Sequence, residues 1–173
     1  MILKIIGSLL VMTATSAIGF ALARDCSRRP RQLRELQGIL QMFENEISFL
    51  SNILTDAFLK IYASASSEVA EFFKATIDNL KAYEGINASE AWEKAVNDNI
   101  KRTALNKEDE SILVSFGKML GNSDLEGQIK NIRLTLTQLK LQEQKAEESR
   151  KKNESMYKNL GILSGLAVVI ILL

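Results

Sequence analysis

Hydrophobic positions divide the chain into an apolar start, a long patterned middle and an apolar end. No charged residue occurs from Ile5 to Ala23. At about 1.5 Å of helical rise per residue this run is about 28 Å long, close to the roughly 30 Å hydrocarbon core of a bilayer. The pattern therefore predicts a transmembrane helix over residues 3–23.

The second apolar run, residues 160–173, is shorter. Alone it reaches only about 21 Å, but Met156 and Tyr157 lengthen it if Lys158 extends its ammonium group back to the headgroups. The run is apolar around the whole helix, which suits lipid better than a protein surface. We expect a second transmembrane helix over residues 156–173; the alternative is an amphipathic or buried C-terminal helix.

Basic residues lie just inside both apolar runs. Lysines and arginines at positions 145, 150–152 and 158 precede the second run. The positive-inside rule therefore places the middle of the chain, residues 24–155, in the cytoplasm. The membrane-proximal basic residues after the first run are Arg28, Arg29, Arg31 and Arg34. They are a topology and lipid signal, or they also contact neighbouring subunits, and the sequence leaves both interpretations open.

A signal peptide is the competing interpretation of the first run. Ala21-Leu22-Ala23 resembles a cleavage site, and cleavage would leave an exported helical protein. However, the basic residues follow the apolar run instead of preceding it, and the run is longer than a usual signal core. An uncleaved membrane anchor is therefore the main hypothesis.

The middle of the chain has the periodicity of helices. From Leu33 to Leu54 apolar residues recur at alternating spacings of three and four, which forms one stripe on a helix whose first turn tolerates Pro30. Similar patterns predict helices over about 55–63 and 69–85, and others that begin at Asn87, Asn106 and Ser123. We expect an all-α fold: an antiparallel bundle of about six helices carried between N- and C-terminal transmembrane helices, with the long first and last bundle helices as antiparallel neighbours.

Capping signals support two of these boundaries. Asn87 with Glu90, and Ser123 with Glu126, have the spacing of capping boxes. The helix after Asn87 carries the only tryptophan, Trp92, which is expected to anchor the core; a surface hot spot is the alternative.

The residue types needed for most catalytic sites are missing. The chain has no histidine and one cysteine, Cys26, so histidine catalysis, His-containing metal sites and an internal disulfide are excluded. No glycine-rich phosphate loop occurs. The neighbouring carboxylates Glu108-Asp109-Glu110 and Glu147-Glu148 are expected on exposed helix faces. We predict no enzyme activity, no cofactor and no metal.

Charge is distributed unevenly along the chain. Residues 35–139 contain 16 acidic and 10 basic residues, although the whole chain has a net charge of +1. That net charge gives no reason to expect nucleic-acid binding. The turns near 85–90 and 121–126 lie farthest from the bilayer in the expected arrangement, where a cytoplasmic partner can reach them. The candidate partner interface is Gly121, Asp124, Glu126 and Glu90.

A small-residue motif lies in the second apolar run. Gly161 and Gly165 form a GxxxG pattern, which lets two membrane helices approach closely. The expected packing partner is either the first span, through Thr15 and Gly19, or another protein.

Several motifs resemble those of the stage III sporulation protein AB family. Their order and the two terminal apolar runs match, so the resemblance covers the whole chain. One departure is Leu54-Thr55-Asp56, where the family often has proline. The matching motifs are Arg29-Pro30-Arg31-Gln32-Leu33-Arg34, Ala91-Trp92-Glu93, Phe116-Gly117 with Leu120-Gly121, Ile132-Arg133-Leu134-Thr135-Leu136-Thr137 and Leu160-Gly161.

The resemblance implies a function and partners that the residues alone do not indicate. The soluble part of that family is similar to the F-type platform domain of type II secretion and type IV pilus systems. The family belongs to a channel between mother cell and forespore, in the mother-cell membrane, and its implied partners are an AA-like ATPase and other channel proteins. Such a platform needs no catalytic residue. The alternative from another class is a membrane-tethered helical signalling module.

Overall fold

The computed structural model describes residues 2–50, 54–65, 67–121 and 124–172, and these are helical apart from turns. The all-α expectation is confirmed for this part of the chain. Residue contacts divide it into unit 1, Met1–Arg28 with Lys145–Leu173, and unit 2, Arg29–Gln144. The helices are α1 (Ile2–Asp25), α2 (Arg28–Leu50), α3 (Leu54–Ser64), α4 (Glu71–Ala82), α5 (Ala88–Asn99), the short 3-10 helix η1 (Ile100–Arg102), α6 (Lys107–Gly117) and α7 (Leu125–Leu172).

Helix α2 buries the stripe that the sequence predicts. Pro30 lies in its first turn, where the missing N–H removes no intrahelical hydrogen bond. The expected stripe from Leu33 ends early, because Leu54 already belongs to α3. The buried residues of the stripe are Leu33, Leu36, Leu40, Phe43 and Ile47.

The helix starts are set by local hydrogen bonds. The predicted capping box at Asn87 is confirmed: its side chain accepts from the N–H of Glu90 at 2.9 Å. The expected helix over 69–85 is shorter, because residues 69 and 70 lie in the preceding turn and Gly85 has a φ of 84°. Ser123 of the other expected box lies outside the described residues; the carboxylate of Asp124 accepts from the N–H of Gly127 at 2.9 Å.

Five aromatic rings form the centre of unit 2. Neighbouring rings lie 5.0 to 6.3 Å apart, mostly edge to face, the arrangement that the charge distribution of aromatic rings favours. The rings come from α2, α3, α4, α5 and α6, so one cluster joins five helices. They are Phe43, Phe58, Phe73, Trp92 and Phe116.

Trp92 is fully buried, as expected for a core anchor. Its indole N–H donates to the carbonyl of Leu113 at 2.7 Å. A Cβ at Gly117 would lie 2.2 Å from its Cδ1 atom, so the indole occupies the space that a side chain would need. Two of the sequence motifs, Ala91-Trp92-Glu93 and Phe116-Gly117, therefore meet in the core.

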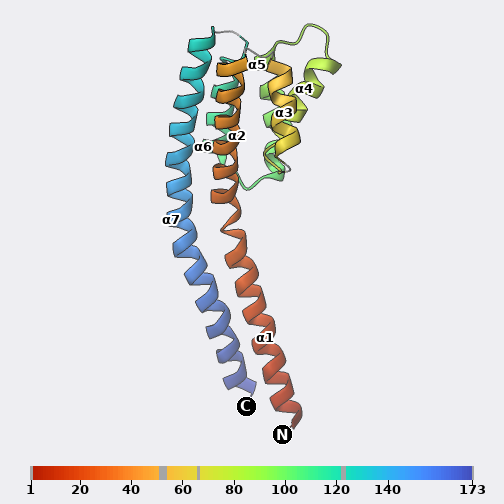
Figure 1. The fold of residues 1–173 in the computed structure, drawn as a ribbon. Helices are drawn as coiled ribbons and strands as arrows, with labels where there is room; N and C mark the ends of the chain where they lie inside the picture. Colours follow the sequence, from red (N-terminus) through yellow and green to blue (C-terminus); the bar gives the residue numbers. More distant parts are fainter. Residues whose placement is uncertain (1, 51–53, 66, 122–123, 173) are drawn as a thin grey trace. The chain divides into compact units, whose positions relative to one another are not determined.

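Helices α2 and α7 of unit 2 lie side by side and run in opposite directions (Figure 1). Arg34 pairs with Glu143, and Arg133 donates to Glu44 at 2.7 Å. Each pair has the same sum of residue numbers, as antiparallel helices require. The antiparallel arrangement expected for the long bundle helices is thus present.

In unit 1, α1 and the end of α7 approach through glycines. A Cβ at Gly161 would lie 3.0 Å from both the Cα of Gly19 and the carbonyl oxygen of Thr15. A Cβ at Gly165 would lie 2.5 Å from the hydroxyl of Thr15. The GxxxG motif therefore faces the small residues of α1, and its role in a membrane stays a prediction.

Across the part of the chain that the structure describes, none of the helices combines the length and the apolar character needed to cross a bilayer. The transmembrane helices expected over 3–23 and 156–173 therefore stay predictions.

Candidate functional site

A buried ion pair joins the start of α2 to the start of α6. The Nε and Nη2 atoms of Arg29 donate to the two carboxylate oxygens of Asp109 at 2.8 and 2.9 Å. The Asp109 side chain is fully buried and that of Arg29 is 21% exposed. Asp109 also accepts from the N–H of Asn106 at 2.9 Å, and Asn106 accepts from the N–H of Asp109 at 3.0 Å. The pair therefore also caps α6.

Gln142 connects α7 to this pair. Its amide oxygen accepts from Arg29 at 3.1 Å, and its amide nitrogen donates to Glu108 at 2.9 Å. Gln142 is 8% exposed, so a polar side chain is held inside the bundle with both ends of its amide hydrogen-bonded. The three helices α2, α6 and α7 thus share one polar network, which we call the Arg29 network: Arg29, Asn106, Glu108, Asp109 and Gln142.

Gln32 extends the polar contacts of α2 one turn further. Its amide oxygen accepts from the N–H of Ala104 at 2.7 Å, and its amide nitrogen donates to Glu68. Gln32 is 4% exposed. The buried polar groups of α2 therefore hold the segment before α6 in place.

These contacts correct two expectations from the sequence. Asp109 does not lie on an exposed charged face, because it is fully buried against Arg29. Arg29 points into the bundle, whereas Arg28, Arg31 and Arg34 are exposed. The sequence signal that was missed is the spacing Asn106-x-x-Asp109. At this spacing the two side chains form a capping box, in which the Asp109 carboxylate turns back toward the start of α6.

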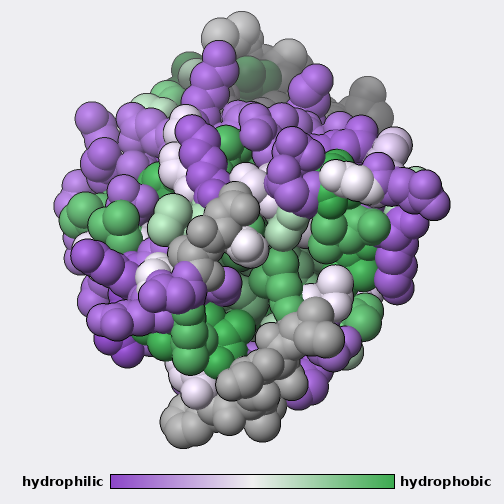
Figure 2. Space-filling view, turned by 90° about the horizontal axis from the view of Figure 1, so that it is seen from above, coloured by the Kyte–Doolittle hydropathy of each residue, from purple (hydrophilic) through white to green (hydrophobic). Residues whose placement is uncertain are grey.

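The two turns proposed as a partner interface lie next to each other. Gly121 has a φ of 74°, and a Cβ on it would lie 3.4 Å from the Cβ of Ala88. Glu90, Asp124 and Glu126 are exposed. Figure 2 shows one face of the molecule, viewed from above relative to Figure 1, as mostly hydrophilic with separate hydrophobic patches. The structure thus places Gly121 next to the start of α5, which carries Glu90, and the candidate interface with its partner stays a prediction.

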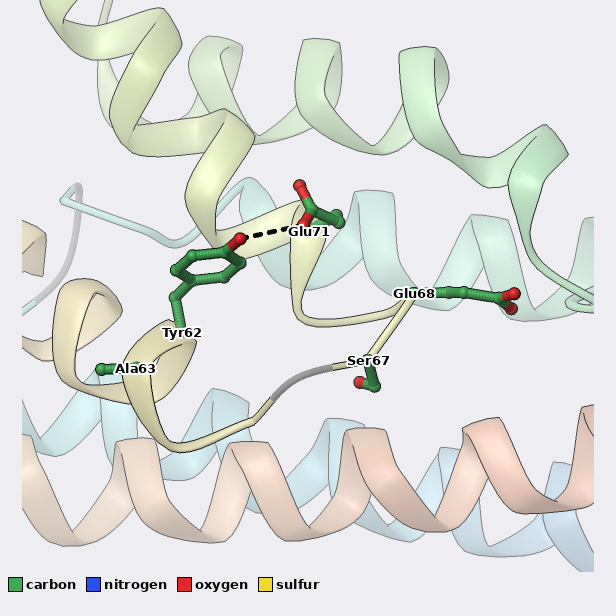
Figure 3. A pocket seen from close by; sticks show the side chains of 5 residues that line it. All are labelled: Tyr62, Ala63, Ser67, Glu68 and Glu71. Carbon is green, nitrogen blue, oxygen red and sulfur yellow. Dashed lines mark hydrogen bonds between the residues drawn. The ribbon is translucent and has the colours of Figure 1, made fainter.

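A hollow of about 550 Å³ lies at the connection between α3 and α4. The hydroxyl of Tyr62 donates to Glu71 at 3.1 Å. Figure 3 shows that Glu68 and Ser67 point away from that pair, so the polar groups of the hollow do not converge. Within the described ranges, no three metal-binding side chains lie close enough to hold an ion.

A ladder of charges runs along α7 in unit 1. Lys158 donates to Glu154 at 2.6 Å, and this hydrogen bond, with the nearby cations, lowers the pKa of Glu154. Hydrogen bonds to Glu147 raise the pKa of Arg150. Such pairs at spacings of three and four support a helix whose surface is polar.

The fold and these sites define an all-α helical-bundle protein with a buried polar network. The chain matches the family described as Stage III sporulation protein AB over residues 4–173, and it belongs to that family. It is therefore a protein of sporulation stage III.

Two known proteins are similar to this chain over most of its length. The Stage III sporulation protein AB of Bacillus subtilis (strain 168) is 35% identical over 171 residues, which cover 99% of each chain. A solved structure of a Stage III sporulation protein AB has a TM-score of 0.67 and 33% identity, and covers 72% of this chain and 98% of its own.

Proposed function

We propose that this protein is a membrane-anchored platform of a secretion-like sporulation channel between mother cell and forespore, and that its bundle binds a partner ATPase. The family match over residues 4–173 carries the proposal. A platform holds other components in position through its surfaces, which agrees with a fold held together by an aromatic core and a buried polar network.

The anchor of this platform is the pair of apolar chain ends. Large apolar side chains of unit 1 lie exposed, among them Leu9 at 66% and Ile170 at 67%. Exposed apolar surface of this kind is costly in water and favourable in lipid. With the charge-free run from Ile5 to Ala23, it supports insertion of residues 3–23 and 156–173 into the mother-cell membrane.

The proposed ATPase contact is the adjoining pair of turns with Gly121, Asp124, Glu126 and Glu90. These carboxylates are exposed and give the surface a negative charge. A basic surface on the ATPase would be attracted to it, and charge complementarity raises the rate of association.

The first test is membrane topology. Cys26 is replaced by serine, Glu126 by cysteine, and intact sporulating cells are treated with a membrane-impermeant maleimide. The proposal expects labelling only after the membrane is opened. Labelling in intact cells would place the bundle outside, would rule out the ATPase contact and would favour an exported protein.

The second test is ATPase binding by the full chain in detergent. Asp124→Lys with Glu126→Lys is expected to weaken binding at least about tenfold, which corresponds to about 1.4 kcal/mol. Asp56→Lys with Asp78→Lys is the matched control, because these are two exposed carboxylates of α3 and α4 outside the two turns. Equal binding by both variants would remove these turns from the interface.

A deletion strain distinguishes the platform from a signalling module. Altered gene expression before any defect in forespore development would favour the signalling module.

A further inference from the structure

The seam between α2 and α7 repeats every seven residues on both sides. On α7 the buried residues are Ile132, Thr135, Leu139 and Gln142, at spacings of three, four and three. The buried stripe of α2, from Leu33 to Ile47, has the same spacing. Helix pairs with this repeat pack as in coiled coils, in which apolar residues alone do not distinguish one register from the next.

Within unit 2, a slip of seven residues would again put apolar residues at most of the apolar positions of this seam. Ile132 would take the place of Leu139, and Leu125 the place of Ile132. Thr135 would then stand where Gln142 stands, and its short side chain cannot reach Arg29 and Glu108. The slipped register would leave the polar groups of the Arg29 network without their partner on α7.

We propose that Gln142 is the buried residue that fixes the register of α7 against α2 within unit 2. It is the buried residue of α7 whose side chain hydrogen-bonds the other two helices of the network, at 3.1 Å to Arg29 and 2.9 Å to Glu108. A buried polar residue at a seam position commonly specifies register at a cost in stability. This assignment does not depend on the proposed function.

Thr135 provides the matched control. It is also buried in the seam, at 2% exposure, but its hydroxyl donates to the carbonyl of Asn131 in the same helix at 2.9 Å. Its hydrogen bond therefore stays the same in any register. Thr135→Val removes a buried polar group and leaves the contacts between helices unchanged.

The register can be measured as a distance between two spin labels by pulsed electron paramagnetic resonance. The full chain carries Cys26→Ser, with Asn45→Cys on α2 and Gln144→Cys on α7, two exposed positions outside the network. The antiparallel pairing separates these positions by about 18 Å along the helix axis, and a slip of seven residues changes that separation by about 10 Å.

Gln142→Leu removes from the seam the polar side chain that bonds to other helices and leaves Arg29 paired with Asp109. The expected result is a second distance population, shifted by about 10 Å along the axis, with unchanged helical content and an equal or higher Tm. Gln142→Leu with Glu143→Ala, which also removes the surface pair with Arg34, should increase that population. Thr135→Val should keep one distance.

Three results would overturn the assignment. One is a single, unmoved distance in both Gln142 variants, which would mean that side-chain packing sets the register. Another is a large loss of Tm, or failure to fold, in Gln142→Leu, which would make the residue a stability element. The third is a second distance in Thr135→Val as well, which would remove the distinction between the two polar residues.

Discussion

At the scale of single residues, Gly117 leaves less room for a side chain than Gly38, Gly85 or Gly121, the other glycines of unit 2 whose surroundings are described. A Cβ there would lie 2.2 Å from the Trp92 ring, whose N–H is already held by Leu113. Gly117→Ala should therefore destabilise the protein by about 1–3 kcal/mol, as overpacking of a core does. Urea unfolding of the full chain in detergent measures the loss.

Gly38 is the control for that substitution. It lies inside α2, is exposed, and a Cβ on it would meet nothing within 4 Å. Gly38→Ala should stabilise the helix by about 0.5–1 kcal/mol. Destabilisation by Gly38→Ala, or an unchanged midpoint in Gly117→Ala, would contradict the packing described around these glycines.

The Arg29–Asp109 pair makes a second prediction at this scale. Arg29→Met leaves a fully buried carboxylate without its cation and should cost about 3 kcal/mol, the lower end of the range because Arg29 is partly exposed. Arg29→Met with Asp109→Leu should cost less than Arg29→Met alone. A double-mutant cycle in urea checks this, and additive losses would show that the two side chains do not interact.

The sequence indicated the residues of the core better than those of the polar network. Trp92 and the stripe of α2 are apolar, and periodicity alone places apolar side chains inward. Asp109 was expected on an exposed helix face because it is polar, and Gln142 was not singled out as a buried residue. Their burial depends on Arg29, which lies 80 and 113 residues away along the chain, and no local pattern contains that contact.

At the scale of elements, the charge ladder of α7 gives a pH dependence. The pKa of Glu154 is lowered below its usual 4.5, mainly by the hydrogen bond from Lys158. Glu154 therefore contributes to stability above pH 4.5, and this contribution is lost as the pH falls through the lowered pKa. Lys158→Gln should move the pKa of Glu154 back up, as the carbon-13 shift of its carboxylate would report.

Lys151→Gln serves as the control for this titration. Lys151 is exposed and precedes Glu154 by three residues, but it is not among the groups that shift the pKa of Glu154. An equal rise of the Glu154 pKa in both variants would mean that general charge, and not the Lys158 hydrogen bond, causes the shift.

Helix ends were predictable where a side chain caps them. The Asn87 cap lies within four residues of its partner, so the sequence contains the whole interaction. The 3-10 helix η1 was not expected, and neither was the start of α4 after residue 70. Both segments adjoin the contacts of Gln32 with Ala104 and Glu68, which tertiary structure provides.

At the scale of the whole molecule, the division into two units predicts that unit 1 can be destabilised while unit 2 stays folded. Gly161→Leu places a side chain against Gly19 and Thr15 and should weaken the α1–α7 packing of unit 1 by about 1–3 kcal/mol. Hydrogen exchange should rise about tenfold or more in peptides from 2–25 and 156–172 and stay unchanged in peptides from 88–117. Gly7→Leu is the control, because a Cβ at Gly7 meets nothing within 4 Å. Faster exchange throughout the chain would mean that the units unfold together.

The general architecture followed from the sequence because its signals are long and repetitive. Helical periodicity over about twenty residues identified α2, and a shorter stripe from Leu125 identified the first part of α7. The boundary between the units near residue 145 lies inside α7, which continues through it as one helix.

The burial of a single indole has a practical consequence. Trp92 is the only tryptophan of the chain, and it is fully enclosed in the aromatic centre of unit 2. Its fluorescence should therefore be emitted at short wavelength in the folded protein and shift to the red when unit 2 opens to water. Since unit 1 contains no tryptophan, the natural chain carries an optical probe that responds to the opening of the bundle around this ring.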